Sequence, residues 1–207
     1  MKTFVIENFL NTDQIEYALN FREPIIDFND NNGVYGNHVI TGQQWLDVHS
    51  DFAVDLLEQL HGVDAFAQNR WDALQVLHAN AAYDVHSDWY TTKNQVIVND
   101  VVENPPTYTV LMPLTPGDFA TVVFDQHGKY NNFSDYKADN QPLDECISDR
   151  EWQQYCSHCH AEDQQYLTLL NAYHWRVGDL LAFDRTLFHC SAHFETEKKA
   201  IVGWLSF

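Results

Sequence analysis

The sequence is poor in basic residues. It has 11 Lys and Arg against 30 Asp and Glu, which gives the 207 residues a formal net charge of −19 at pH 7. An electrostatic field of this sign repels phosphate backbones and anionic lipid surfaces. The charge balance therefore disfavours nucleic acid and membrane partners, although a local basic pocket is compatible with it.

The sequence also lacks long apolar runs and has little cysteine. No segment approaches the roughly 18 consecutive apolar residues of a membrane span, and Glu7 follows Met1 too closely for a signal peptide. Four cysteines are too few for a disulfide scaffold, and reduced thiols fit a reducing compartment. We expect a soluble, cytoplasmic protein with four reduced cysteines, which are Cys146, Cys156, Cys159 and Cys190.

The residues that are abundant suggest one folded domain over residues 1–207. Hydrophobic residues make up 45% and aromatic residues 14% of the chain, which is enough for a substantial core. Residues 5–10 read as a short strand, and the spacing of apolar residues predicts helices at residues 11–19 and about 43–60. Gly62 is the expected stop of the second helix. We expect both helices to brace a sheet from outside.

From residue 73 onward, the pattern changes to short strands separated by turn residues. Many short strands without intervening helices indicate a mainly β fold of the α+β class, with the two packed sheets of a jelly roll. Residues 126–173 interrupt this pattern as a partly helical insertion, in which Ser148 and Glu151 have the spacing of a capping box. An insertion of this length is usually functional or a lid. The expected strands are residues 73–79, 81–86, 95–102, 107–114, 120–125, 179–183, 188–192 and 199–207.

Two residues near the start of this region have the spacing of a metal-binding pair. His86 and Asp88 follow an apolar run at residues 73–82, and residues two apart on a strand project to the same side. A second histidine, His189, follows another apolar run. Two imidazoles and one carboxylate on one side of a divalent ion make the facial triad of non-haem Fe(II) sites, which leaves the opposite positions open.

The order of these residues resembles that of the Fe(II)/2-oxoglutarate-dependent dioxygenases, and most closely their prolyl-hydroxylase-like branch. The pattern is His86-Ser87-Asp88, then His189 about a hundred residues on, then the basic residue Lys198 nine residues further. The resemblance covers residues 83–207. It includes the Gly178-Asp179 turn before the second histidine, and Trp204 near the end of the last strand.

The resemblance implies a double-stranded β-helix core and an oxidative reaction. Fe(II) would be held by the expected catalytic and metal-binding residues, His86, Asp88 and His189. The co-substrates would be 2-oxoglutarate and O2, and the reaction would release succinate and CO2 while it hydroxylates a C–H bond. The substrate would be a small molecule or a peptide. Asp88 supplies a carboxylate ligand, which disfavours the halide-binding variant of this family.

The resemblance also implies a site for 2-oxoglutarate. Lys198 would pair with the 5-carboxylate of this co-substrate, because it shares the inward face of the last strand if Ala200 faces inward. Lys199 is the competing lysine. Tyr108 and Thr109 are expected to be further hydrogen-bond donors to the co-substrate.

Several residues near the predicted triad have competing interpretations. His193 shares a face with His189, but it lies only five residues before Lys198, too near for the spacing of the family. Arg185 is either a cation at the rim of the pocket or the salt-bridge partner of Asp184 or another carboxylate. Three aromatic residues either line the substrate entrance or pack in the core, and these are Tyr83, Trp89 and Tyr90.

A separate motif has the spacing of half a zinc site. Cys156 and Cys159 are related as C-x2-C, and His158 and His160 lie beside them. The sequence does not identify a second pair of ligands, since only Cys146 and His174 lie nearby. The alternative is a set of exposed polar residues at the end of a helix.

Two other functions fit the same triad. A cupin-like metal-binding or sensing protein would bind the ion without oxygenase turnover. A structural or interaction module would retain only a vestigial site and would bind no Fe(II) above a His86→Ala control. Succinate release coupled to O2 uptake separates the oxygenase from both.

Overall fold

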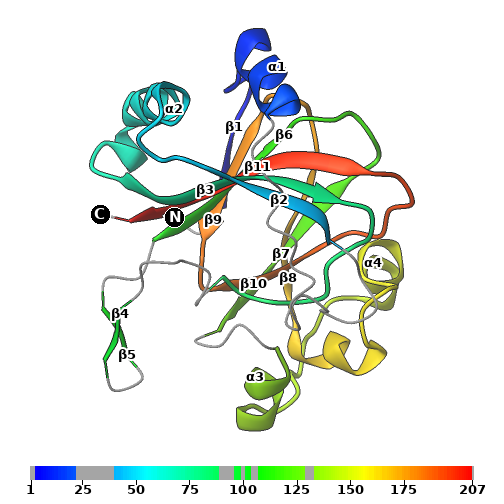
Figure 1. Ribbon diagram of the computed structural model, residues 1–207. Coiled ribbons are helices and arrows are strands. Elements are labelled where there is room, and N and C mark those ends of the chain that lie inside the picture. Colours follow the sequence, from blue (N-terminus) through cyan, green and yellow to red (C-terminus); the bar gives the residue numbers. More distant parts are fainter. Residues whose placement is uncertain are drawn as a thin grey trace.

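The chain folds into two antiparallel sheets that pack face to face, with helices on both outer sides (Figure 1). The computed structural model describes residues 3–21, 40–88, 96–98, 101–103, 107–128 and 133–206. This mixed α and β architecture with two antiparallel sheets confirms the predicted fold class.

The larger sheet has six strands in the order β1-β9-β6-β11-β3-β2. The last strand of the chain, β11, lies at its centre between β3 and β6 and pairs Ala200 with Leu77 and Pro113. The strands of this sheet are β1 (Thr3–Ile6), β2 (Ile40–Leu46), β3 (Arg70–Ala79), β6 (Tyr108–Pro113), β9 (Leu180–Asp184) and β11 (Lys198–Ser206).

The smaller sheet has three strands in the order β10-β7-β8. These strands are β7 (Ala120–His127), β8 (Leu169–His174) and β10 (Leu187–Ser191). A separate hairpin consists of β4 (Val96–Val98) and β5 (Val101–Glu103), where the sequence predicts one strand over residues 95–102. The sequence did not predict β8, which lies largely within the expected insertion.

Two helices cover the outer face of the larger sheet, as predicted. Helix α1 (Thr12–Asn20) begins at a capping box formed by Asn11 and Gln14, and helix α2 (Asp51–His61) ends at Gly62, as expected. A short 3-10 turn, η1 (Asp64–Phe66), follows α2. Of the helices in the described ranges, none is both long and apolar enough to cross a membrane.

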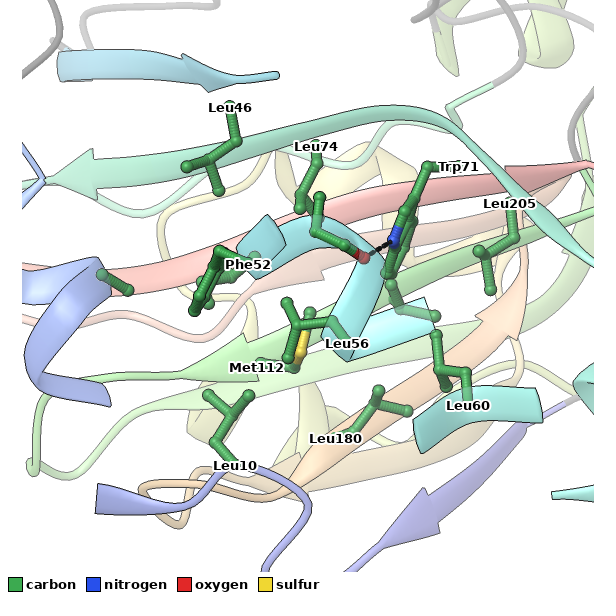
Figure 2. Close-up of a cluster of buried hydrophobic side chains, with 14 of the residues drawn as sticks. Leu10, Leu46, Phe52, Leu56, Leu60, Trp71, Leu74, Met112, Leu180 and Leu205 are labelled. Atoms are coloured by element: carbon green, nitrogen blue, oxygen red, sulfur yellow. Dashed lines mark hydrogen bonds between the residues drawn. The ribbon is translucent and has the colours of Figure 1, made fainter. Parts of the chain in front are cut away.

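The apolar core beneath these helices fixes α2 against the sheet. In Figure 2, Leu56 and Leu60 of α2 face Met112 and Leu180 of the sheet, and all four side chains are fully buried. The indole N–H of Trp71 on β3 donates a 2.8 Å hydrogen bond to the Ala53 carbonyl. The larger sheet is thus held rigidly from outside, which leaves its inner face for the site.

The helix predicted over residues 43–60 is wrong in its first part. Residues up to Leu46 form β2, which pairs with β3, and α2 starts only after Ser50, whose hydroxyl accepts a hydrogen bond from the Ala53 N–H. The spacing of apolar residues suited a helix, but the free edge of β3 offered backbone hydrogen bonds to an extended segment. Tertiary pairing therefore overrode the local pattern.

The strand predicted over residues 81–86 is also wrong. Only His86 makes a β-bridge there, to His189 of strand β10, and the rest of the segment is irregular. The bridge nevertheless extends the smaller sheet by one pairing beyond β10.

The expected insertion packs on the outer face of the smaller sheet. It contains α3 (Phe133–Asp139), α4 (Asp149–Tyr155) and the 3-10 turn η2 (Ala161–Tyr166), and the capping box of Ser148 and Glu151 is present at the start of α4. Trp152 is buried in a cluster with Val122, Phe124 and Phe188 of the sheet. The described part of the insertion therefore supports the back of the smaller sheet and is not a lid over the space between the sheets.

A turn at Gly178 ties the N-terminal segment to the larger sheet. Gly178 has φ +85°, which L side chains rarely adopt, and its carbonyl accepts a 2.8 Å hydrogen bond from the Leu10 N–H. The neighbouring Asp179 carboxylate accepts hydrogen bonds from the Asn8 N–H at 2.9 Å and the Tyr173 hydroxyl at 3.1 Å. This is the turn that the sequence places ahead of the second histidine.

Candidate metal centre

His86, Asp88 and His189 meet in the space between the two sheets. Their ligand atoms all lie within 4.8 Å of one another, and Nε2 of His189 is 3.7 Å from Oδ2 of Asp88. Asp88 is only 5% exposed and His189 only 8% exposed. The convergence that the sequence predicts is therefore present in the structure.

Backbone pairing fixes the two histidines relative to each other. The His86 N–H donates to the His189 carbonyl at 3.0 Å, and the His189 N–H donates to the His86 carbonyl at 2.8 Å. The two rings lie with their centroids 4.3 Å apart. A single β-bridge thus positions His86 beside His189, where the sequence predicts a full strand.

Each of the two rings directs Nδ1 at a backbone carbonyl. Nδ1 of His86 lies 2.7 Å from the Asp84 carbonyl oxygen, and Nδ1 of His189 lies 3.1 Å from the Leu187 carbonyl oxygen. Because a carbonyl can only accept, each Nδ1 carries a proton, so Nε2 is the nitrogen through which each neutral ring could bind a metal. Histidines that bind metals are commonly oriented in this way.

The environment keeps His189 neutral and Asp88 ionised. Burial, together with the neighbouring His86, lowers the pKa of His189. Burial acts to raise the pKa of Asp88, but the two imidazoles and a hydrogen bond from Thr109 lower this pKa by more than burial raises it. A neutral imidazole and a carboxylate are the forms that bind a divalent cation.

Two residues outside the triad hold Asp88 in place by hydrogen bonds. The Thr109 hydroxyl on β6 donates a 2.6 Å hydrogen bond to Oδ2 of Asp88. Arg185 is 0% exposed, and its Nε donates at 2.8 Å to the backbone carbonyl of Asp88, as does its Nη2. Arg185 is therefore not a cation at the pocket rim, and that interpretation is wrong. Burial lowers its pKa to about 10, so it stays charged at neutral pH.

We expect Thr109→Val to weaken divalent metal binding by about 10- to 100-fold, the usual effect of losing a hydrogen bond behind a metal ligand. The variant removes the hydroxyl and leaves the side-chain volume nearly unchanged, so Asp88 loses its orienting donor. Anaerobic calorimetry with Fe(II) measures the affinity. Thr109→Ser keeps the hydroxyl and should bind almost as the natural chain does. Equal affinities for all three chains would contradict the role given to Thr109.

Lys198 lies in the same interior layer with its ammonium buried. Its side chain faces inward with Ala200, is 3% exposed, and donates a 2.8 Å hydrogen bond from Nζ to the Ser191 hydroxyl. Nζ lies 4.6 Å from the centroid of the Trp175 ring and 4.4 Å from that of Phe194. Among the described residues, no carboxylate forms a salt bridge with this ammonium.

Lys199 points elsewhere. Its Nζ lies 4.0 Å from the Glu197 carboxylate near the surface, and its backbone N–H donates to the Thr115 hydroxyl. Of the two lysines that compete in the sequence, only Lys198 reaches the interior.

Solved structures with this arrangement of sheets are known. The chain matches the 2-oxoglutarate complex of the viral collagen prolyl hydroxylase from Paramecium Bursaria Chlorella virus-1 with a TM-score of 0.53 and 12% identity, covering 100% of this chain and 96% of that chain. It matches HygX from Streptomyces hygroscopicus, with nickel and 2-oxoglutarate bound, with a TM-score of 0.55 and 12% identity, covering 99% and 82%. It matches the α-ketoglutarate-dependent epimerase SnoN from nogalamycin biosynthesis with a TM-score of 0.58 and 9% identity, covering 99% and 78%.

The chain has the fold of the Fe(II)/2-oxoglutarate oxygenases. No protein-family model matches the sequence, and no curated protein matches it either. The oxygenase fold is therefore visible in the three-dimensional arrangement and in the spacing of a few residues, but not in overall sequence similarity.

Of the other residues considered for the site, Tyr108 and His193 lie away from the triad, whereas Tyr83 lies beside it. Tyr108 faces the helices, where its ring packs on Phe4 and Phe66, so the structure does not bring it to the interior site. His193 is exposed. The ring of Tyr83 lies 5.9 Å from that of His86 and is partly buried. The two remaining aromatic residues, Trp89 and Tyr90, lie outside the described residues.

Sequence reasoning missed the residues that surround Lys198. Ser191 follows His189 by two positions on β10, so the strand alternation that placed the triad could have found it. Trp175 and Phe194 come from two irregular segments, and no sequence pattern relates them to Lys198.

Proposed function

We propose that this chain is a non-haem Fe(II) oxygenase that uses 2-oxoglutarate and O2 to hydroxylate a C–H bond, with release of succinate and CO2. The observation that carries the proposal is the buried ammonium of Lys198, which lacks a salt bridge among the described residues and lies in the same interior layer as the triad. A buried charge of this kind is costly unless an anion pairs with it. A carboxylate of the co-substrate would supply that anion.

The triad fits Fe(II). His86, Asp88 and His189 offer two imidazole nitrogens and one carboxylate, and their ligand atoms lie close enough for one ion to contact all three. This donor set is typical of non-haem Fe(II) oxygenases and leaves positions open for a co-substrate and O2.

The Lys198 site fits the far end of a five-carbon dicarboxylate. Ser191, which accepts the hydrogen bond from Lys198, lies two residues beyond His189 on the same face of β10. Two residues along a strand span about 6.6 Å, comparable with the length of such a molecule. The Ser191 hydroxyl and the Lys198 ammonium would hold the 5-carboxylate, while the rings of Trp175 and Phe194 exclude water around it.

Bound Fe(II) would supply the oxidative chemistry, in which 2-oxoglutarate loses CO2 and a substrate C–H bond gains a hydroxyl group. The residues of this chain do the rest. Asp88 and the two histidines hold the ion on one side, Thr109 and Arg185 keep Asp88 in place, and Lys198 orients the co-substrate. The substrate is a small molecule or a peptide on this proposal, in keeping with the chain's net charge of −19.

The Lys198 site favours the oxygenase over a cupin-like protein that only binds or senses a metal. A metal-binding role requires the triad alone and gives no reason to bury a lysine ammonium beside it. Two proteins with this fold contain 2-oxoglutarate in their structures, which also supports the proposal. SnoN has this fold but is an epimerase, so the fold alone does not specify the reaction. Hydroxylation is therefore part of the proposal.

The proposal is tested by titrating the anaerobic, Fe(II)-loaded chain with 2-oxoglutarate. We expect a visible charge-transfer absorption as the keto acid binds, followed by succinate formation when O2 is admitted. Glutarate, which lacks the keto oxygen, should give neither signal. Fully loaded iron without the absorption and without succinate would contradict the proposed function.

A further inference from the structure

A second group of side chains of the types that bind metals lies on the opposite face of strand β10. Ligand atoms of His158, Cys159 and Cys190 all lie within 4.8 Å of one another. A third thiol belongs to the same group, because Sγ of Cys156 lies 3.8 Å from Sγ of Cys190. Three thiols and one imidazole therefore lie side by side, away from the triad, and three of them, His158, Cys159 and Cys190, are mutually within 4.8 Å while Cys156 adjoins them through Cys190.

The C-x2-C motif presents its two thiols through a tight turn at the end of helix α4. Cys156 is the C-cap of this helix, and the Cys159 N–H donates a 2.8 Å hydrogen bond to the Cys156 carbonyl. His158 lies inside the turn, with Nε2 3.3 Å from Sγ of Cys159 and 3.0 Å from the Tyr83 carbonyl oxygen. The turn is thus already ordered around its ligands.

The remaining thiol comes from the smaller sheet. Cys190 follows the triad residue His189 directly, so the alternation of a strand sends the two side chains to opposite faces. Cys190 is 1% exposed and packs in the same cluster as Cys156, Cys159 and Trp152 of the insertion. The sequence offered no partner for the C-x2-C motif because Cys190 lies more than thirty residues away in the chain.

The spacing of these atoms fits a tetrahedral zinc site. Zinc bonds of about 2.3 Å to sulfur place two thiolates about 3.8 Å apart, and a nitrogen ligand at about 2.0 Å lies about 3.5 Å from each sulfur. The Sγ atoms of Cys156 and Cys190 lie 3.8 Å apart, and Sγ of Cys159 lies 3.3 Å from Nε2 of His158. To bind zinc through Nε2, His158 would give up its hydrogen bond to the Tyr83 carbonyl. A set of three cysteines and one histidine is a common ligand set of structural zinc.

We propose that Cys156, Cys159, Cys190 and a ring nitrogen of His158 bind one structural Zn²⁺ ion. The site joins the turn after α4 to strand β10. Cys190 and His189 are consecutive residues of β10 and face opposite sides of it. The zinc ion would therefore hold β10 from its outer face, while His189 on the inner face belongs to the triad. The inference goes beyond the proposed oxygenase activity and does not depend on it.

A disulfide between Cys156 and Cys190 is the competing interpretation of their proximity. It would need an S–S bond of about 2.05 Å, shorter than the 3.8 Å in the structure, and all four cysteines are reduced there. A disulfide would also use only two of the three thiols and would leave His158 without a role.

The test is a titration of the full-length, metal-free, reduced chain with Co²⁺ under anaerobic conditions. Thiolate ligands give Co²⁺ an intense near-ultraviolet charge-transfer absorption, whereas the triad has no sulfur. We expect this absorption to saturate at one equivalent per chain for the thiolate site and to vanish when Zn²⁺ displaces Co²⁺, since these ligands favour zinc. A chain that binds Co²⁺ without the thiolate absorption, or forms the disulfide instead, would overturn the proposal.

Variants assign the absorption to named residues. Cys190→Ser and Cys159→Ser should each weaken Zn²⁺ binding by more than about tenfold and reduce the thiolate absorption. Cys146→Ser changes an exposed cysteine outside the cluster and is the matched control, so it should bind as the natural chain does. His86→Ala should keep the thiolate absorption, which separates this site from the triad. The titration of the natural chain decides the case even if a serine variant fails to fold.

Discussion

His189→Ala is expected to abolish the O2-dependent conversion of 2-oxoglutarate to succinate and to weaken Fe(II) binding by more than about 100-fold. The loss should exceed the 10- to 100-fold effect of removing a hydrogen bond behind a ligand, because a ligand itself is removed. His189 is held in place on strand β10, where it is buried next to Phe183 and paired through its backbone with His86. Anaerobic Fe(II) titration and a succinate assay measure the two effects.

His193→Ala is the matched control for this prediction. It removes a histidine four positions further along the chain that is exposed to solvent. It should retain both Fe(II) affinity and succinate formation. If the two variants lost activity equally, or if His189→Ala kept its iron, the assignment of the triad would be wrong.

Lys198→Met should weaken 2-oxoglutarate binding by about 30-fold or more, because removal of one partner of a buried charge pair usually costs about 2–5 kcal/mol. Methionine keeps much of the side-chain volume between Trp175 and Phe194 but removes the ammonium. Fe(II) affinity should stay within about a factor of three of the natural value, since Lys198 is not a ligand. The 2-oxoglutarate-induced absorption of the Fe(II) protein measures the affinity.

The same lysine predicts a pH dependence. Burial lowers the pKa of Lys198 to about 7 in the absence of a bound carboxylate. Below pH 7 the ammonium is already present, but above pH 7 binding must first add a proton, so the affinity for 2-oxoglutarate should fall by up to about tenfold per pH unit. Lys198→Arg stays charged and should remove this dependence while it retains binding.

Lys199→Met is the control for both measurements, because its ammonium lies near Glu197 at the surface. It should leave the affinity and the pH profile unchanged. A loss of affinity in Lys199→Met but not in Lys198→Met would reverse the assignment of the co-substrate anchor.

Much of the candidate site follows from the period of two along a strand. On β11, that period places Lys198 inside together with Ala200 and Val202 and sends Lys199 outward. On β6, it also means that neighbours such as Tyr108 and Thr109 cannot both face the site, so the two could not both have been donors to one ligand. Thr109 faces the site, where it binds Asp88 instead.

Contacts between residues far apart in the chain could not be predicted from the sequence. The buried Arg185 binds the backbone of a residue 97 positions away, and composition gives no sign that a guanidinium will hold a carbonyl. Cys190 is equally invisible as a partner of the C-x2-C motif. In each case the decisive contact is made by side chains that fold topology alone brings together.

The single bridge at His86 divides the triad into unequal parts. His189 belongs to a paired strand, whereas His86 and Asp88 share one irregular segment. The contacts of this segment include the bridge, the Asp88 N–H bond to the Arg185 carbonyl, and hydrogen bonds from the Arg185 guanidinium and the Thr109 hydroxyl. A substitution that disturbs this segment, such as one that removes the Arg185 hydrogen bonds to the Asp88 carbonyl, should therefore displace two of the three ligands at once, while the third stays in the sheet.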